Sequence, residues 1–170
     1  DAARATGLPQ GTPVIVGMGD VAALFGGAPP KVGRVLCSLG SSSMVFAPLP
    51  AGVQVADPAH RLYVYPWGPY PVLGGVSSIT GAALTWAYER LGQGQPFQRW
   101  VTEVLTAPPG ANGLCFIPYL AGDRSPYWND AIRGGFFGLQ LGHDHRDLGR
   151  AVMEGVAYSL RHLLDIYAEL

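Results

Sequence analysis

Hydrophobic and polar positions along the chain predict short strands in its first part and longer helices in its second. Short apolar runs bounded by Gly and Pro are typical of strands, and apolar positions that recur every three to four residues are typical of helices. The expected strands are residues 14–16, 34–39, 44–47, 62–65, 72–75, 114–118 and the short extended segment 135–139. The expected helices are 77–91, 97–105 and 147–170, with at most a short helix over 20–25 and a polar loop over 121–133. This order predicts a mixed α/β domain with helices packed over a sheet.

The last helix has the strongest pattern. One stripe along it includes Leu148, Val156 and Leu163 at helical spacing. Asp144 or Asp147 is expected to cap its first turn.

The apolar run at 14–16 continues into Gly17-Met18-Gly19-Asp20. A strand that ends on glycines places the next side chain beyond its carboxyl end, which is where ligands bind in open α/β sheets. Asp20 is also the only carboxylate between Ala2 and Ala56. We therefore expect Asp20 to face a ligand.

A second glycine turn, Gly40-Ser41-Ser42-Ser43, lies between the strands expected at 34–39 and 44–47. A turn of this kind is able to point backbone N–H groups and hydroxyls at an anion, although an ordinary hairpin turn fits the pattern equally well. The nucleophile pattern G-x-S-x-G and the Walker phosphate loop are both absent here. An acid facing such a turn is the arrangement expected where a base meets phosphates.

A dinucleotide-binding domain is the alternative suggested by Gly17-x-Gly19-x-x-Ala22. Its context does not fit, because the next helix is short and the first acid after Asp20 is Asp57. A ribose-binding acid would be expected about 20 residues after the strand.

Charge and composition restrict the partners. Charged residues make up 14% of the 170-residue chain, the net charge is −1, and Lys31 is the only lysine. This argues against nucleic acid and anionic membranes as partners, and no apolar run approaches the roughly 20 residues of a membrane span. A surface with so few charges suggests contact with another domain or a second subunit of a homodimer. We expect a cytoplasmic protein whose Cys37 and Cys115 are buried, reduced thiols.

Other polar and aromatic positions carry weaker signals. His143-Asp144-His145 fits a solvated loop with a helix cap better than a metal site, because no further ligands are near in the sequence. Arg124 and Arg133 are possible anion ligands, but solvated arginines fit as well. The tryptophans are expected in the core or at an interface: Trp67, Trp86, Trp100 and Trp128.

Several motifs, in this order and spacing, resemble the C-terminal domain of the FGGY carbohydrate kinases, and in particular the xylulokinase branch. They are Gly19-Asp20, Ser38-Leu-Gly-Ser-Ser-Ser43, Phe116-Ile-Pro-Tyr-Leu-Ala-Gly-Asp-Arg-Ser-Pro-Tyr-Trp128 and Arg133-Gly-Gly-Phe-Phe-Gly-Leu139. The most specific part is Gly134-x-Phe136-x-Gly138-Leu139, followed after seven residues by Asp147-Leu148-x-x-Ala151-Val152-Met153-Glu154. The resemblance covers essentially the whole chain.

The resemblance implies a ribonuclease-H-like, actin-like ATPase fold and a cleft shared with an N-terminal domain, which together hold a sugar, ATP and Mg²⁺. Asp20 falls on the family's catalytic base, which also contacts the substrate. Gly40 and Ser41, with Ser42 and Ser43 beside them, fall on an ATP-phosphate-binding turn. Gly81 and Thr85 fall on nucleotide contacts.

The resemblance also implies that residues 1–170 form a C-terminal domain that ends before the family's adenosine-binding loop. We therefore expect the 170-residue chain by itself to lack kinase activity.

Departures from the family pattern leave the function open at two points. Val21 stands where the family usually has Asn or Gln in contact with the substrate, and Ser43 stands where it has a second glycine; Asp123 replaces a common Glu. The first hypothesis is a kinase for a ketopentose such as xylulose. The alternatives are a gluconate or polyol kinase, or a non-catalytic member that binds a sugar or a protein.

Overall fold

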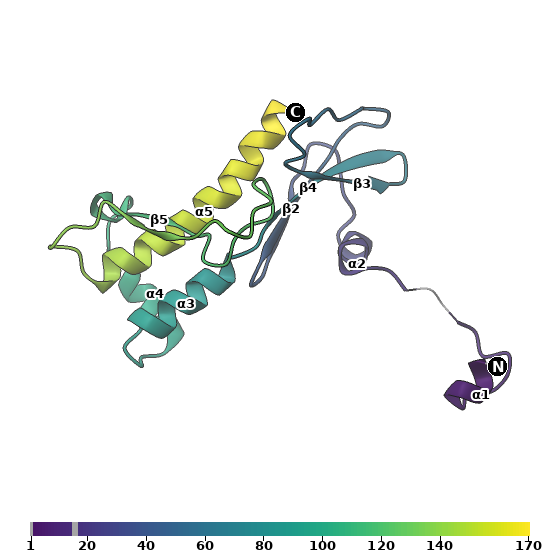
Figure 1. Cartoon of the computed structure of the whole chain (residues 1–170), viewed down its shortest axis with the longest axis horizontal. Coiled ribbons are helices and arrows are strands. Elements are labelled where there is room, and N and C mark those ends of the chain that lie inside the picture. The colour runs from purple at the N-terminus through teal and green to yellow at the C-terminus, as the bar shows by residue number, and fades with distance from the viewer. Residues whose placement is uncertain (1, 15–16) are drawn as a thin grey trace.

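The computed structural model describes residues 2–14 and 17–170. Its helices are α1 (Ala2–Thr6), α2 (Asp20–Gly27), α3 (Gly81–Leu91), α4 (Phe97–Val104) and α5 (His145–Glu169), with a 3₁₀ turn, η1, at Ala111–Gly113. Its strands are β1 (Leu36–Leu39), β2 (Ser43–Pro48), β3 (Tyr63–Trp67), β4 (Tyr70–Ser77), β5 (Cys115–Ile117) and β6 (Gly135–Phe137). Figure 1 shows α1 apart from the other elements.

A four-stranded antiparallel sheet with the order β1-β2-β4-β3 forms one part of the molecule. Side chains alternate between its two faces. On one face, Phe46 and Val72 pack against Phe25 of α2. On the other face, Val45 and Leu73 pack against the C-terminal part of α5. The sheet is therefore covered on both sides, as the predicted mixed α/β domain requires.

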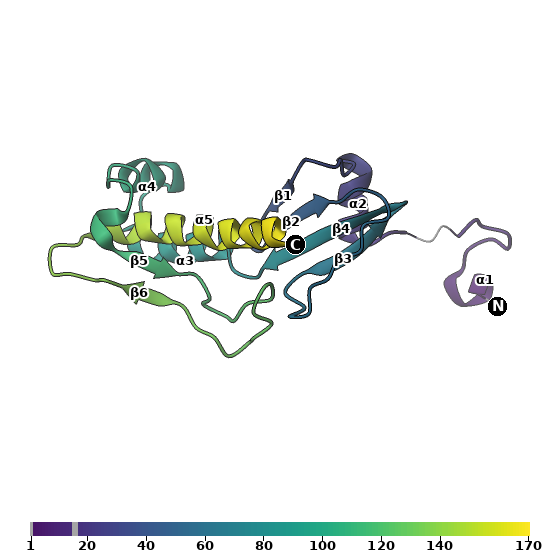
Figure 2. The ribbon, with the colours of Figure 1, turned by 90° about the horizontal axis from the view of Figure 1, so that it is seen from above.

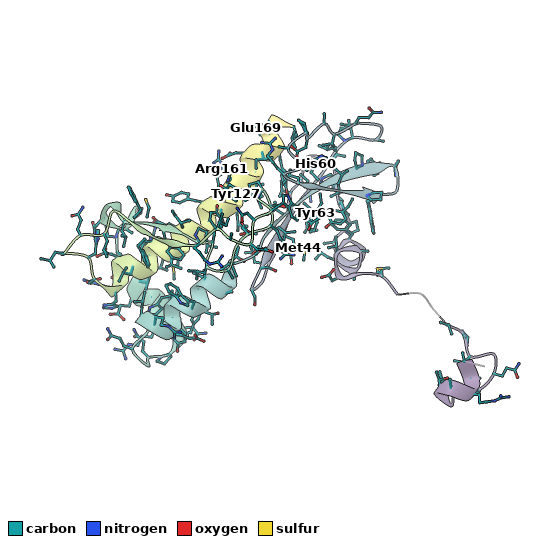
Figure 3. All side chains as sticks on the ribbon, viewed as in Figure 1. Met44, His60, Tyr63, Tyr127, Arg161 and Glu169 are labelled. Carbon is teal, nitrogen blue, oxygen red and sulfur yellow. The ribbon has the colours of Figure 1, made fainter. Side chains whose placement is uncertain are left out.

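Helix α5 joins this sheet to the rest of the fold. Leu163 and Ile166, near its end, lie on the sheet, whereas Ala151 and Val152, near its start, belong to a second core with α3, α4 and β5. Figure 2 shows α5 running along both parts, with the β5–β6 sheet at one end and the four-stranded sheet at the other. Glu169, at the far end of α5 (Figure 3), forms a 2.8 Å ion pair with Arg61.

The start of α5 agrees with the sequence prediction. Asp144 is the N-cap, and its carboxylate accepts a 2.8 Å hydrogen bond from the N–H of Arg146. The Asp147 carboxylate accepts a bond from the N–H of Asp144, which completes a capping box.

Most predicted elements are confirmed, two predictions need correction and one stays untested. The helix expected over 77–91 begins at Gly81, because Ser77 is still paired with Ser43 as the last residue of β4. Ile15 and Val16 lie outside the described residues, and Val14 is in no strand and is 90% exposed. A buried strand before Asp20 therefore stays a prediction.

The burial of the cysteines is the second correction. Both thiols are free, as expected, but exposed. Cys37 lies on the edge strand β1. Cys115 faces outward because its neighbour Phe116 takes the inward position of the alternating strand β5.

Candidate functional site

The turn between β1 and β2 is fastened to the beginning of α3 through its carbonyl oxygens. The Gly40 carbonyl accepts a 3.0 Å hydrogen bond from the N–H of Gly81. The Ser41 carbonyl accepts bonds of 2.9 Å from the N–H of Thr80 and 3.1 Å from that of Ala82. Residues far apart in the sequence thus hold both carbonyls toward the protein interior.

This arrangement turns the donors of the same peptide units outward. In a trans peptide the C=O and the following N–H point in opposite directions. With the Gly40 and Ser41 carbonyls directed inward, the N–H groups of Ser41 and Ser42 point away from α3. Within residues 2–14 and 17–170, neither N–H has a hydrogen-bond partner. Adjacent outward N–H groups beside an exposed serine form a concave site suited to an anion.

Gly81 is fixed by this contact. A Cβ atom at this position would lie 2.4 Å from the carbonyl oxygen of Gly40, far inside van der Waals contact. Gly81 and the turn are therefore brought together, and the first N–H groups of α3 are used by the turn itself. Thr85 lies about one turn further along α3, with its side chain exposed.

The Ser43 side chain takes a different position from its three neighbours. Ser43 begins β2, and alternation along the strand places it on the face opposite Met44. It is 1% exposed, and its Oγ lies 2.7 Å from the Oγ1 of Thr80. The Ser43 hydroxyl thus faces the protein interior, whereas Ser41 is exposed.

Asp20 is the first residue of α2. Phe25 anchors this helix to the sheet through edge-on aromatic contacts with Phe46 and Trp67, at 5.0 and 5.2 Å between ring centroids. The Asp20 side chain is exposed, and its only bond within the described residues is a 2.8 Å hydrogen bond from the N–H of Val21. No other described side chain occupies this carboxylate, so its oxygens face outward from α2.

A pocket of about 320 Å³ lies beside Asp20. Its walls are Asp20, Val21, Leu24, Ser38 and Met44. Met44 lies on β2 and packs with the α2 residues (Figure 3). Apart from Asp20 and Ser38, the wall is apolar.

The pocket and the glycine turn lie at the same end of the β1–β2 hairpin. Ser38 and Met44 are directly opposite each other, and only the pair Leu39–Ser43 separates them from the turn. Two residues of a strand span roughly 7 Å. The structure therefore brings the predicted base and the predicted phosphate turn into one neighbourhood.

Asp123 and Thr80 support the site but were not predicted as site residues from the sequence. Asp123 is 3% exposed, and its carboxylate accepts hydrogen bonds of 2.6 Å from the N–H of Ser78 and 2.9 Å from that of Arg124. Burial raises the pKa of Asp123 above its usual value, although these hydrogen bonds act to lower it. The motif around Asp123 was a sequence signal for that residue. Thr80 had no such signal, because the partners of its side chain are all distant in the sequence.

The loop at 121–133 is held against the sheet. Trp128 packs edge-on against Tyr63 of β3 with ring centroids 4.7 Å apart. The Nε of Arg124 donates to the Ser78 hydroxyl at 3.1 Å, and Arg133 donates to the carbonyls of Asp130 and Ile132. Both arginines therefore have protein partners.

Burial raises the pKa of Tyr65, and the negative charge of Asp20 raises it further. Among the residues that the structure describes, no group of three or more His, Cys, Asp or Glu side chains is arranged to hold a metal ion.

The same architecture occurs in solved sugar kinases with the actin-like ATPase fold. The crystal structure of ligand-bound xylulose kinase from Lactobacillus acidophilus superposes with a TM-score of 0.78 at 28% identity, over 93% of this chain and 32% of that one. Xylulose kinase from Rhodospirillum rubrum gives 0.78 at 29% identity, over 99% and 34%. The fold is thus that of the actin-like ATPases.

The chain belongs to the FGGY family of carbohydrate kinases: the sequence model of that family's C-terminal domain matches residues 35–170. The chain is 37% identical to the xylulose kinase of Lactococcus lactis over 135 residues, which are 77% of this chain and 26% of that protein. It is 30% identical to the gluconokinase of Bacillus subtilis over 166 residues, 91% and 32% respectively. It spans between about a quarter and a third of the length of these relatives. None of the described helices has the length and apolar character to cross a membrane.

Proposed function

We propose that this chain is part of an ATP-dependent sugar kinase that phosphorylates a hydroxyl of a ketopentose such as xylulose. The observation that carries the proposal is the position of Asp20 and the outward N–H groups of Ser41 and Ser42 at one end of the β1–β2 hairpin. The similarity to xylulose kinases supports the choice of sugar.

In the proposed reaction, Asp20 acts as the general base. A sugar hydroxyl is a poor nucleophile, and a carboxylate within hydrogen-bond reach accepts its proton as the γ-phosphoryl group is transferred. The pocket beside Asp20 holds the sugar, with Ser38 as its further polar wall.

The turn stabilises the phosphates. The N–H groups of Ser41 and Ser42, with Gly40 allowing close approach and the exposed Ser41 hydroxyl beside them, face the charge that develops on the phosphoryl oxygens. The Ser43 hydroxyl holds the turn from behind. Gly81 supports the turn at the nucleotide, and Thr85 is the polar nucleotide contact on the exposed side of α3.

Mg²⁺ fits these residues. In phosphoryl-transfer sites the ion is held by substrate phosphates and one or two carboxylates, and Asp20 is such a carboxylate beside the turn. When bound, Mg²⁺ neutralises charge on the transferring phosphoryl group.

The length of the relatives supports one further part of the proposal, a second domain. An N-terminal domain of the same polypeptide closes the cleft and excludes water, which otherwise competes with the sugar. We place the enzyme in the cytoplasm. The exposed apolar side chains Ile117 and Phe137, on the outer face of the β5–β6 sheet, are the surface we assign to a second subunit of a homodimer.

A gluconate or polyol kinase is the second candidate, and the similarity to gluconokinases favours it. A non-catalytic member is less well supported, because the Ser43 side chain is turned into the protein and leaves the outer surface of the turn open. Val21 remains the feature that favours it.

ADP release by the complete protein, measured across ketopentoses, polyols and sugar acids, tests the proposal. We expect one ketopentose to be strongly preferred and the 170-residue chain alone to be inactive. Preference for gluconate or a polyol selects the second candidate. ATP binding without ADP release for any acceptor would overturn the kinase proposal.

A further inference from the structure

The hydroxyls of Thr80 and Ser43 form a pair behind the phosphate turn. We propose that they are positioning residues that hold the turn with its N–H groups outward and so set the affinity for ATP phosphates. This inference rests on the proposed function of the turn. Neither side chain touches the nucleotide; both act through the backbone of Gly40 and Ser41.

The number of available protons decides how the pair is bonded. The Thr80 Oγ1 lies 3.1 Å from the Gly40 carbonyl, 3.3 Å from the Ser41 carbonyl and 2.7 Å from the Ser43 Oγ. A hydroxyl donates one proton and accepts through its lone pairs. Carbonyls only accept, so the arrangement that bonds all of these groups has Thr80 donating to the turn and Ser43 donating to Thr80.

The single Thr80 proton therefore adds to the inward set of bonds, and its nearer carbonyl acceptor is that of Gly40. The Gly40 carbonyl already accepts from Gly81, and the Ser41 carbonyl from the N–H groups of Thr80 and Ala82. The added hydroxyl bond opposes rotation of these peptide planes. Rotation would turn the N–H groups of Ser41 and Ser42 away from the anion.

Burial makes the pair sensitive to the loss of either member. Ser43 is 1% and Thr80 2% exposed. A buried hydroxyl that loses its partner destabilises the fold by its full desolvation free energy, because water does not replace the lost hydrogen bond. Ser43 stands where the family resemblance places a second glycine, so the Ser43–Thr80 bond is a feature of this chain's own sequence.

The neighbouring carboxylate anchors the same segment. Asp123 holds the N–H of Ser78 at 2.6 Å, two residues before Thr80. The segment that carries Thr80 is thus fixed at both ends, by Asp123 and by the start of α3. A fixed support is what a positioning residue needs in order to transmit its geometry to the turn.

The test uses the complete protein and its variants Thr80→Val, Thr80→Ser, Ser43→Ala and the double variant Ser43→Ala/Thr80→Val. The measurements are the Kd for ATP by isothermal titration, the KM values for ATP and sugar, and the thermal unfolding midpoint. Thr80→Val keeps the shape and removes the hydroxyl. Thr80→Ser keeps the hydroxyl and is the rescue variant.

We expect Thr80→Val to raise the Kd and KM for ATP about 5- to 50-fold, the range for one buried hydrogen bond. The KM for the sugar should stay within about twofold, because the turn does not contact the sugar. Thr80→Ser should bind ATP nearly as the wild type does, and Ser43→Ala should have a smaller effect than Thr80→Val. The double variant should be no worse than Thr80→Val, because Ser43 acts through Thr80.

A folded Thr80→Val variant with unchanged ATP affinity would overturn the inference, and so would equal losses for ATP and sugar. If Thr80→Val does not fold, the test rests on Ser43→Ala. An ATP affinity of Ser43→Ala equal to that of the wild type would then refute the positioning role of the pair. If the wild type binds ATP without transferring phosphate, the proposed function fails, while the ratios of Kd values still test the pair. If the wild type binds no ATP, both are refuted.

Discussion

The α-carbon of Gly81 lies against the carbonyl oxygen of Gly40, so that a Cβ atom at residue 81 would come within 2.4 Å of it. This contact joins the start of α3 to the turn between β1 and β2. It requires a glycine although the backbone of residue 81 is helical, because the limiting factor is space and not conformation.

We therefore expect Gly81→Ala to destabilise the protein by about 1–3 kcal/mol, the usual cost of overpacking, and to weaken ATP binding. Urea unfolding and ATP titration measure the two effects. Gly26→Ala in α2 is the matched control, because its added methyl group would meet no neighbouring segment within 4 Å and helical Ala is favoured over Gly. Unchanged stability of Gly81→Ala would show that the turn moves freely relative to α3.

Replacing the proposed base tests the chemistry. Asp20→Asn keeps the size of the side chain and removes its ability to accept the sugar proton, so kcat should fall about 10²-fold or more. Asp165→Asn is the control, since Asp165 forms an exposed ion pair with Arg161. A kcat within about threefold of the wild type, far less than the loss of a positioned base causes, would remove Asp20 from its role.

The apolar wall beside Asp20 predicts the sugar preference. Val21, Leu24 and Met44 offer no hydrogen bond to a substrate hydroxyl in the pocket. Val21→Asn adds a donor and an acceptor there, and we expect it to lower the KM for the hydroxylated sugar about 2- to 10-fold relative to a deoxy analogue, the worth of one hydrogen bond. If kcat/KM for the sugar relative to the deoxy analogue is the same in Val21→Asn and in the wild type, the sugar does not bind beside residue 21.

The buried Asp123 predicts opposite outcomes for two substitutions. Asp123→Ala leaves the N–H of Ser78 without its acceptor and should cost about 1–3 kcal/mol. Asp123→Asn keeps an acceptor and removes a buried charge, so the protein should unfold at the same or a higher temperature at pH 7. Because burial raises the pKa of Asp123 in the folded state, its charge costs stability as the pH rises through that pKa. Strong destabilisation by Asp123→Asn at pH 7 would show that the charge itself is needed.

The cap of α5 predicts acid sensitivity of the opposite sign. The hydrogen bond from the Arg146 guanidinium lowers the pKa of Asp144 to about 2. The cap therefore stabilises the fold above the ordinary pKa of an unfolded aspartate, near 3.9, and loses this contribution as the pH falls toward 2. Asp144→Ala should cost about 1 kcal/mol at pH 7. Between pH 4 and 2 the variant should show a shallower loss of stability than the wild type, as followed by circular dichroism.

The sequence was most informative where neighbouring residues determine the structure. Periodicity along α5 and the acids at its start predicted both the helix and its cap, because helix spacing and capping depend on residues within a few positions. The hairpin around the Gly40 turn was predicted for the same reason. The exposed Cys37 and Cys115 were predicted wrongly, since an apolar run does not reveal which strand lies at an edge or which face is covered.

The same distinction between local and distant contacts applies to the candidate site. The sequence by itself determined the chemical groups, Asp20 and a glycine–serine turn, and through its motifs the family. Only the tertiary structure decided that the turn's carbonyls face α3 and that Ser43 points inward to Thr80. It also decided that Asp123 binds the N–H of Ser78, just before Thr80. These contacts join residues about 40 positions apart. No local pattern encodes them, because they arise when the tertiary structure brings distant donors and acceptors within hydrogen-bond distance.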